Sequence, residues 1–97
     1  MASVRVFLES GFDHDEVTMS AGGAAHEEHE VTTRYQVGLA KVVDLTLPDG
    51  EPSNLRITVR NLSAEAAITP EQTPYVRVNA TATGLTVEPE SAPPMYG

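Results

Sequence analysis

The chain has 97 residues, enough for one domain with a hydrophobic core of its own, and it contains no cysteine. The lack of cysteine excludes disulfides, thiolate nucleophiles, iron–sulfur clusters and cysteine-ligated zinc. Fourteen acidic residues against six basic ones give a formal net charge of −8, which argues against nucleic acid and anionic membranes as partners because both bind concentrated positive charge.

The amino-terminal end has neither the basic segment nor the long apolar stretch of a secretory signal. No run in the sequence approaches the ~18 apolar residues of a membrane-spanning helix. A chain without cysteine also fits a reducing compartment. We therefore expect a cytoplasmic protein that does not contact membranes.

Apolar and polar residues alternate along most of the chain, in short runs separated by Gly, Pro, Asp and Asn. A period of two places the apolar side chains on one side of a strand, so the pattern predicts β-structure. The residues expected to face inward are Val4, Val6, Leu8, Val17, Met19, Val31, Tyr35, Val37, Leu39, Val43, Leu45, Leu47, Leu55, Ile57, Val59, Val76, Val78, Ala80, Leu85 and Val87.

Four segments of the first half follow this pattern, divided by turn-forming residues. The expected strands cover residues 3–9, 16–21, 31–39 and 41–47, and the segment 24–30 lies between the second and the third. Gly22 and Gly23 suit a tight hairpin turn. The segment 24–30 is unusually polar, so it is either an edge strand or a loop. Gly38 marks a bulge or a bend.

The second half begins with a turn over residues 48–52, where Pro fixes one dihedral angle and Gly takes the left-handed position. The strands expected after it cover residues 54–60, 64–69, 75–81 and 85–88. The segment 64–69 is rich in alanine, so a helical turn is an alternative there. Prolines at positions 89, 93 and 94 cannot continue a ladder and predict an extended tail.

Seven or eight short strands at roughly ten-residue spacing are typical of a β-sandwich. We therefore predict an all-β protein with one antiparallel β-sandwich domain over residues 1–88 and a Pro-rich tail over residues 89–97.

The segment that joins the expected strands 54–60 and 75–81 is similar to a corner found in known β-sandwich domains. The stretch Leu62–Ala80, with Pro70, Tyr75, Val76 and Val78, resembles the corner before the sixth strand of fibronectin type III and immunoglobulin-like domains. The buried tryptophan and paired cysteines of those families are missing, and transthyretin-like sandwiches have the same strand cadence. The resemblance implies an immunoglobulin-like or transthyretin-like architecture and names no binding residue.

All three histidines lie in the most acidic part of the chain. Imidazole and carboxylate groups bind divalent metals, and carboxylates also make a nearby histidine hold its proton more tightly. The candidate metal ligands are His14, His26, His29, Glu28 and Glu30.

The hairpin geometry limits this site. A two-residue turn pairs Glu16 with His29 and puts His14 near Val31. On a strand His26 shares a face with Glu28 and Glu30 but not with His29, whereas a helical turn would bring His26, His29 and Glu30 together.

No catalytic motif stands out, and no glycine-rich phosphate loop is present. We therefore expect a non-catalytic module, without a cofactor, that serves protein interaction or a structural role. Its partner is another protein or a second copy, bound at a sheet edge or at an outward face. That face would carry Phe7, Arg34, Arg56, Arg60 or Arg77. The first alternative is a metal- or pH-responsive accessory protein that uses His14, His26 and His29. The second is a small enzyme whose catalytic residues the sequence does not identify.

Overall fold

The computed structural model describes residues 2–21, 24–34, 36, 38–47, 52–69, 71–81 and 83–92, and these form eight strands and no helix. The strands are β1 (Ala2–Leu8), β2 (Asp15–Ala21), β3 (Ala24–Val31), β4 (Lys41–Leu47), β5 (Ser53–Val59), β6 (Leu62–Ile68), β7 (Tyr75–Ala80) and β8 (Leu85–Glu90). The prediction of an all-β protein is therefore confirmed. In this part of the chain no helix is long and apolar enough to cross a membrane.

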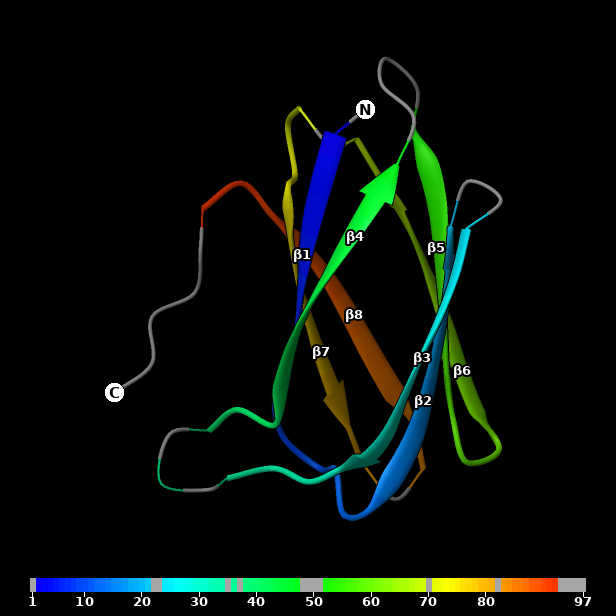
Figure 1. Ribbon diagram of the computed structural model, residues 1–97, viewed down its shortest axis with the longest axis vertical. Coiled ribbons are helices and arrows are strands. Elements are labelled where there is room, and N and C mark those ends of the chain that lie inside the picture. The colour runs from blue at the N-terminus through cyan, green and yellow to red at the C-terminus, as the bar shows by residue number, and fades with distance from the viewer. Residues whose placement is uncertain are drawn as a thin grey trace.

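The strands form two four-stranded sheets that face each other (Figure 1). The first sheet has the order β4-β1-β7-β8 and the second has the order β3-β2-β5-β6. The hairpins β2–β3, β5–β6 and β7–β8 each stay within one sheet, and the other connections cross between the sheets. The pairing of β1 with β7 is parallel, so the prediction of a purely antiparallel sandwich is wrong at this one pair.

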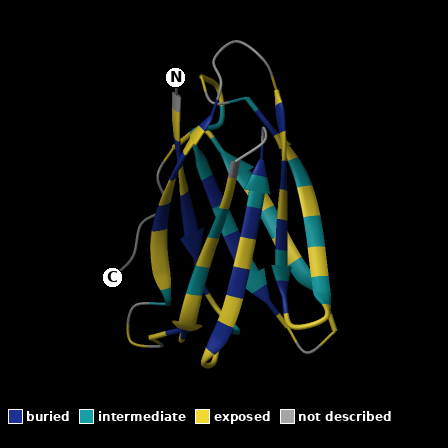
Figure 2. Ribbon diagram, turned by 45° about the vertical axis from the view of Figure 1, so that its right-hand side comes forward, coloured by how far each residue is buried: buried dark blue, intermediate teal, exposed yellow. Residues whose placement is uncertain are grey.

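The core lies between the sheets and follows the alternation of the sequence. Figure 2 shows buried and exposed bands alternating along the strands, as expected when every second side chain faces the opposite sheet. Burying a large apolar side chain contributes about 1.5–3 kcal/mol to stability. The strand residues with no exposed surface are Val4, Val6, Leu8, Val17, Met19, Leu47, Leu55, Ile57, Val59, Ile68, Val76 and Val78.

The two lateral sides of the sandwich differ. Strands β6 and β8, which are edges of opposite sheets, pack closely along one side. On the other side β3 and β4 make only slight contact, and their upper ends lie apart in Figure 1. The second side is therefore the more open of the two.

The strand expected over residues 31–39 is wrong. Val31 ends β3, and the described residues that follow contain only an isolated bridge between Arg34 and Leu39. Gly38 adopts a positive φ of 71° and donates its backbone N–H to the carbonyl of Arg34 at 2.8 Å, so it forms a bend. Tyr35 and Val37, which were expected to face inward, lie outside the described residues.

The alanine-rich segment is a strand, so the helical alternative for residues 64–69 is wrong. It pairs with β5 along its whole length, from Val59 opposite Leu62 to Ser53 opposite Ile68. The cross-strand partner decides the conformation here, because alanine by itself favours a helix.

The last strand continues two residues beyond the expected end at Glu88, and Pro89 lies opposite Val76. Val78 and Ala80 direct backbone groups away from β8, to Glu9 and Ser10, so by alternation Val76 does the same. The missing N–H of Pro89 would therefore point to the free edge, and no ladder bond is lost. The turns expected at Gly22–Gly23 and over residues 48–51, and the tail residues 93–97, lie outside the described residues.

Candidate functional site

The register of the β2–β3 hairpin is the predicted one over most of its length, from Ala21 opposite Ala24 to Val17 opposite Glu28. It brings His29 to Glu16, with Nδ1 and Oε1 3.3 Å apart. Beyond this point the register shifts by a bulge, and Asp15 pairs with Val31. The prediction that Glu16 and His29 are neighbours is therefore confirmed.

The three histidines lie in three different environments. His14 is in the loop after β1, where its side chain is 78% exposed. His29 is on the outer face of β3. His26 is opposite Met19, whose side chain is fully buried, so His26 faces the space between the sheets.

The five candidate metal ligands do not come together. Within the described residues, no group of three or more His, Cys, Asp or Glu side chains is placed to hold a metal ion. His26 and Glu28 are in contact, as their shared face predicts. Glu30 does not join them, because it adopts a positive φ of 54° where the bulge interrupts the alternation.

Glu28 instead forms what we call the Glu28 cluster, consisting of His26, Glu28 and Lys41. One carboxylate oxygen of Glu28 contacts Nε2 of His26 and the other contacts Nζ of Lys41. The Glu28 side chain is only 14% exposed. Hydrogen bonds from Lys41 and then from His26 lower the pKa of Glu28, although burial opposes them.

Sequence reasoning missed Lys41 as a member of this cluster. Lys41 is the first residue of β4 and lies opposite Leu8, which is fully buried, so its side chain starts on the inward side of the strand. The period-two pattern of the segment could have revealed this position, because Lys41 is two residues before Val43. The pattern could not reveal its partner, which belongs to the other sheet.

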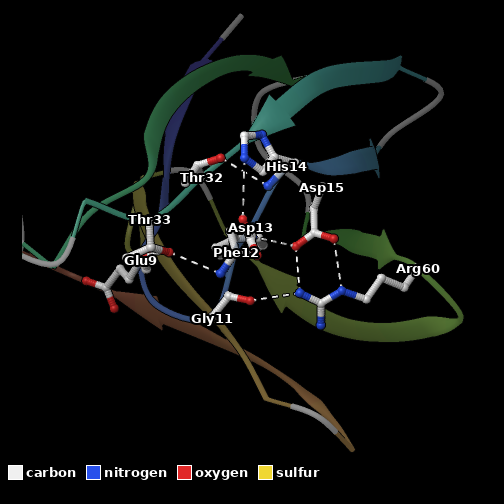
Figure 3. A network of polar contacts seen from close by, with 9 residues as sticks. All are labelled: Glu9, Gly11, Phe12, Asp13, His14, Asp15, Thr32, Thr33 and Arg60. Atoms are coloured by element: carbon white, nitrogen blue, oxygen red, sulfur yellow. Dashed lines mark hydrogen bonds and ion pairs between the residues drawn. The ribbon is translucent and has the colours of Figure 1, made fainter.

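The loop end of the second sheet carries a polar network centred on Asp15 (Figure 3). Arg60 donates from Nε and Nη2 to the two carboxylate oxygens of Asp15, at 2.9 and 2.6 Å, and from Nη2 to the carbonyl of Gly11 at 2.9 Å. Burial alone would raise the pKa of Asp15, but the bonds from Arg60 and from the backbone N–H of Asp13 outweigh it and lower the pKa.

Thr33 joins the β3–β4 connection to the β1–β2 loop by hydrogen bonds (Figure 3). Its hydroxyl donates to the carbonyl of Glu9 at 2.7 Å and accepts the N–H of Phe12 at 3.1 Å. The backbone N–H of Thr33 also donates to the carbonyl of Phe12 at 2.9 Å. Phe12 is only 1% exposed, so these bonds satisfy backbone groups that water does not reach.

The residues predicted to form an outward binding face are mostly engaged within the protein. Arg56 is bonded to Glu65 at 2.7 Å, Arg77 to Glu9 at 2.9 Å, and Arg60 to Asp15. Phe7 is only 7% exposed, and its ring centroid is 6.2 Å from that of Tyr75. Arg34 is exposed in the β3–β4 loop. Four of the five residues therefore have side-chain contacts within the protein.

The four edge strands differ in how they are protected against pairing with another chain. Natural edges are blocked by lysine, proline, bulges or inward-pointing charges. Strand β3 has the bulge and the inward-facing Glu28, β4 begins with Lys41, and β8 contains Pro89. Strand β6 has none of these features, and its one charged residue, Glu65, is neutralised by Arg56.

The backbone of β6 is oriented for pairing at this edge. A two-residue turn, Arg60–Asn61, joins Val59 to Leu62, so the N–H of Leu62 points toward β5. Alternation then directs the backbone groups of Ser63, Glu65 and Ala67 away from the sheet. Among the backbone hydrogen bonds of the described residues outside the ladders, none involves these three residues.

Three of the four inward-facing residues of β6 are incompletely covered, and the fourth, Ile68, is fully buried. Leu62, Ala64 and Ala66 are half-buried, whereas every second residue of the neighbouring β5 is buried. A strand added beside β6 would cover more of this apolar surface.

No known protein family, no characterised protein and no solved structure matches this chain.

Proposed function

We propose that this chain is a non-catalytic protein-interaction module that accepts an extended strand from another polypeptide at the edge of β6. The observation that carries the proposal is the lack of lysine, proline, bulge and inward-pointing charge on β6, the one edge strand of the four without any of them. The same edge serves self-association when the partner is a second copy.

Charge supports the choice of β6. The whole chain carries a formal net charge of −8, so two copies repel each other at most orientations. Beside β6 the charges of Arg56 and Glu65 cancel, and the other residues on that outer face are small and uncharged. Strand addition at this edge therefore brings two chains together with little local repulsion, and main-chain hydrogen bonds supply the affinity.

We also propose that the sandwich is transthyretin-like and not immunoglobulin-like. In immunoglobulin-like domains the second and third strands belong to opposite sheets. Here β2 and β3 form a hairpin within one sheet, and each sheet has four strands. The strand order supports the transthyretin-like alternative.

Two further parts of the proposal are independent of the edge. We propose a cytoplasmic location, which the lack of cysteine favours, and activity without a cofactor. The alternative of an accessory protein responsive to pH has its support in the Glu28 cluster.

Substitutions at Ala67 test the use of β6. The outward N–H of Ala67 is removed by Ala67→Pro without loss of a bond to β5, whereas the control Ala67→Ser keeps the N–H. We expect both variants to remain within about 1 kcal/mol of the parent in unfolding free energy. Association is measured by sedimentation equilibrium between about 10 µM and about 1 mM, the range of weak protein contacts.

A synthetic peptide with the sequence of residues 62–68, blocked at both ends, serves as a probe for strand addition by a partner. We expect association, or peptide-induced amide shifts at Ser63, Glu65 and Ala67, in the parent and in Ala67→Ser, and neither effect in Ala67→Pro. Association that survives Ala67→Pro would contradict the use of β6. Absence of both effects in the parent up to about 1 mM would contradict the interaction module itself.

A further inference from the structure

The open side of the sandwich has charged side chains where a core would have apolar ones. His26 and Glu28 lie opposite Met19 and Val17, both fully buried, so they face the other sheet. Lys41 meets them from β4. The Glu28 cluster therefore lies between β3 and β4, where the two strands themselves make only slight contact. Glu28 is largely covered there, whereas the side chains of His26 and Lys41 are 39% and 49% exposed.

Glu28 contacts side chains from both strands that border this space. Its two oxygens are divided between Nε2 of His26 on the same strand and Nζ of Lys41 on the other sheet. Among the ion pairs of the described residues, the pair of Glu28 and Lys41 is the one that joins a strand of the second sheet to a strand of the first. The opposite side is held differently, by the close packing of β6 and β8.

We propose that the Glu28 cluster is an acid-released latch, and that neutralising Glu28 frees β3 from β4 while β6 and β8 stay packed. Protonation of the carboxylate removes the negative charge that lies between Lys41 and His26. The Lys41 ammonium then has no negative partner on β3, and the attraction that joins β3 to β4 at this point is lost.

The charged groups around the latch are few. Strand β2 presents the apolar Val17 and Met19 to it. Next to the cluster, His29, Glu30 and Arg34 line a shallow hollow together with Lys41. No other charged residue of β4 points inward, because Asp44 is exposed and bonded to Arg5.

The pH at which the latch opens follows from the environment of Glu28. Its hydrogen bonds to Lys41 and His26 lower its pKa, so the carboxylate stays charged through neutral and mildly acidic conditions. The latch is closed there and opens only as the pH falls through this lowered pKa. Removal of the Lys41 charge opens it at neutral pH as well.

Hydrogen exchange measured strand by strand tests the latch. Glu28→Gln removes the charge at neutral pH, and Glu27→Gln is the matched control, because Glu27 is the adjacent residue, loses the same charge and is exposed. At pH 7 we expect amides of β3 and β4 to exchange about three- to tenfold faster in Glu28→Gln, and those of β6 and β8 to change by less than about twofold. Glu27→Gln should leave all strands as in the parent.

The parent protein gives a second readout that needs no substitution. We correct the exchange rates for the intrinsic effect of pH. The rates at β3 and β4 should then rise when the pH falls below the ordinary pKa range of carboxyl groups. At higher pH they should change in parallel with the rates at β6 and β8. Lys41→Gln should reproduce the neutral-pH pattern of Glu28→Gln. Equal exchange in Glu28→Gln and Glu27→Gln, or uniform acceleration of all strands in the parent, would overturn the latch and leave the β6 proposal unaffected.

Discussion

Gly11 occupies a position where no other residue fits without a steric clash. Its φ is +88°, and a Cβ added there would lie 1.8 Å from the carbonyl oxygen of Ala80. The β1–β2 loop therefore passes directly against the end of β7, and the carbonyl of Gly11 remains available to Arg60. Only glycine combines this backbone conformation with this close approach.

We expect Gly11→Ala to destabilise the protein by about 3 kcal/mol or more, because the methyl group collides with backbone atoms that have no room to move. Gly38→Ala is the control. Gly38 also has a positive φ of 71°, but a Cβ added there would meet no atom of the described residues within 4 Å, so only the backbone cost of about 1 kcal/mol remains. Urea denaturation of both variants measures the difference, and equal losses would contradict the steric explanation.

Thr33 offers an isosteric test of the buried network. Thr33→Val removes the hydroxyl that joins Glu9 and Phe12 and leaves both backbone groups without that partner, so we expect a loss of about 1.5–3 kcal/mol. In Thr32→Val the N–H of His14 loses a bond of 3.0 Å at an exposed site and turns to water, which costs less than about 1 kcal/mol. Thermal or urea unfolding that ranks the two variants in the opposite order would refute this account of the network.

At the scale of the element, strand β8 shows how a proline is accommodated in a ladder. Pro89 is placed where its missing N–H would face the free edge, so it blocks pairing without weakening the β7–β8 hairpin. We expect Pro89→Thr to change the unfolding free energy by less than about 1 kcal/mol but to increase self-association. Light scattering over a concentration series measures the association, and an unchanged monomer fraction would contradict a guarding role for Pro89.

The sequence was sufficient to predict strand bounds and register where the local pattern and the turn-forming residues agreed. The register that places Glu16 beside His29 followed from a two-residue turn, and Lys41–Leu47 was predicted with its observed bounds. Residues 31–39 were mispredicted because alternation alone does not show that Glu30 takes a positive φ and that a bulge ends the strand at Val31. Likewise, the extension of β8 through Pro89 depends on which edge is free, and only the strand order determines that.

The candidate site was less predictable than the fold, because its key contacts join distant parts of the chain. The pairs Lys41–Glu28 and Arg60–Asp15 each connect segments whose proximity is decided by the sheet order. The five arginines and one lysine are individually inconspicuous in the sequence. Their partners depend on how β2, β3, β4 and β5 are arranged in the folded protein.

At the scale of the whole molecule, acid should weaken the fold. The pKa values of Asp15 and Glu28 are lower in the folded protein than their ordinary values, so their contribution is complete above the unfolded pKa and is lost as the pH falls through the folded one. We expect the urea concentration at the unfolding midpoint to change little between pH 7 and about 5. Once the pH is lower than about 4, this concentration should decrease. The double variant Asp15→Asn, Glu28→Gln should start lower and fall less steeply, and an equal slope would contradict this assignment.

The parallel pairing of β1 with β7 has a consequence for synthesis on the ribosome. Strand β1 emerges before the other seven described strands, yet it lies in the interior of its sheet, between β4 and β7. The residues that complete its second ladder are Tyr75–Val78, so a nascent chain that ends before them leaves one edge of β1 open, next to the apolar Val4, Val6 and Leu8. The ladder between β1 and β7 therefore forms only after residues 75–78 have been translated, and long-range pairing of this kind slows folding and prolongs exposure to other nascent chains.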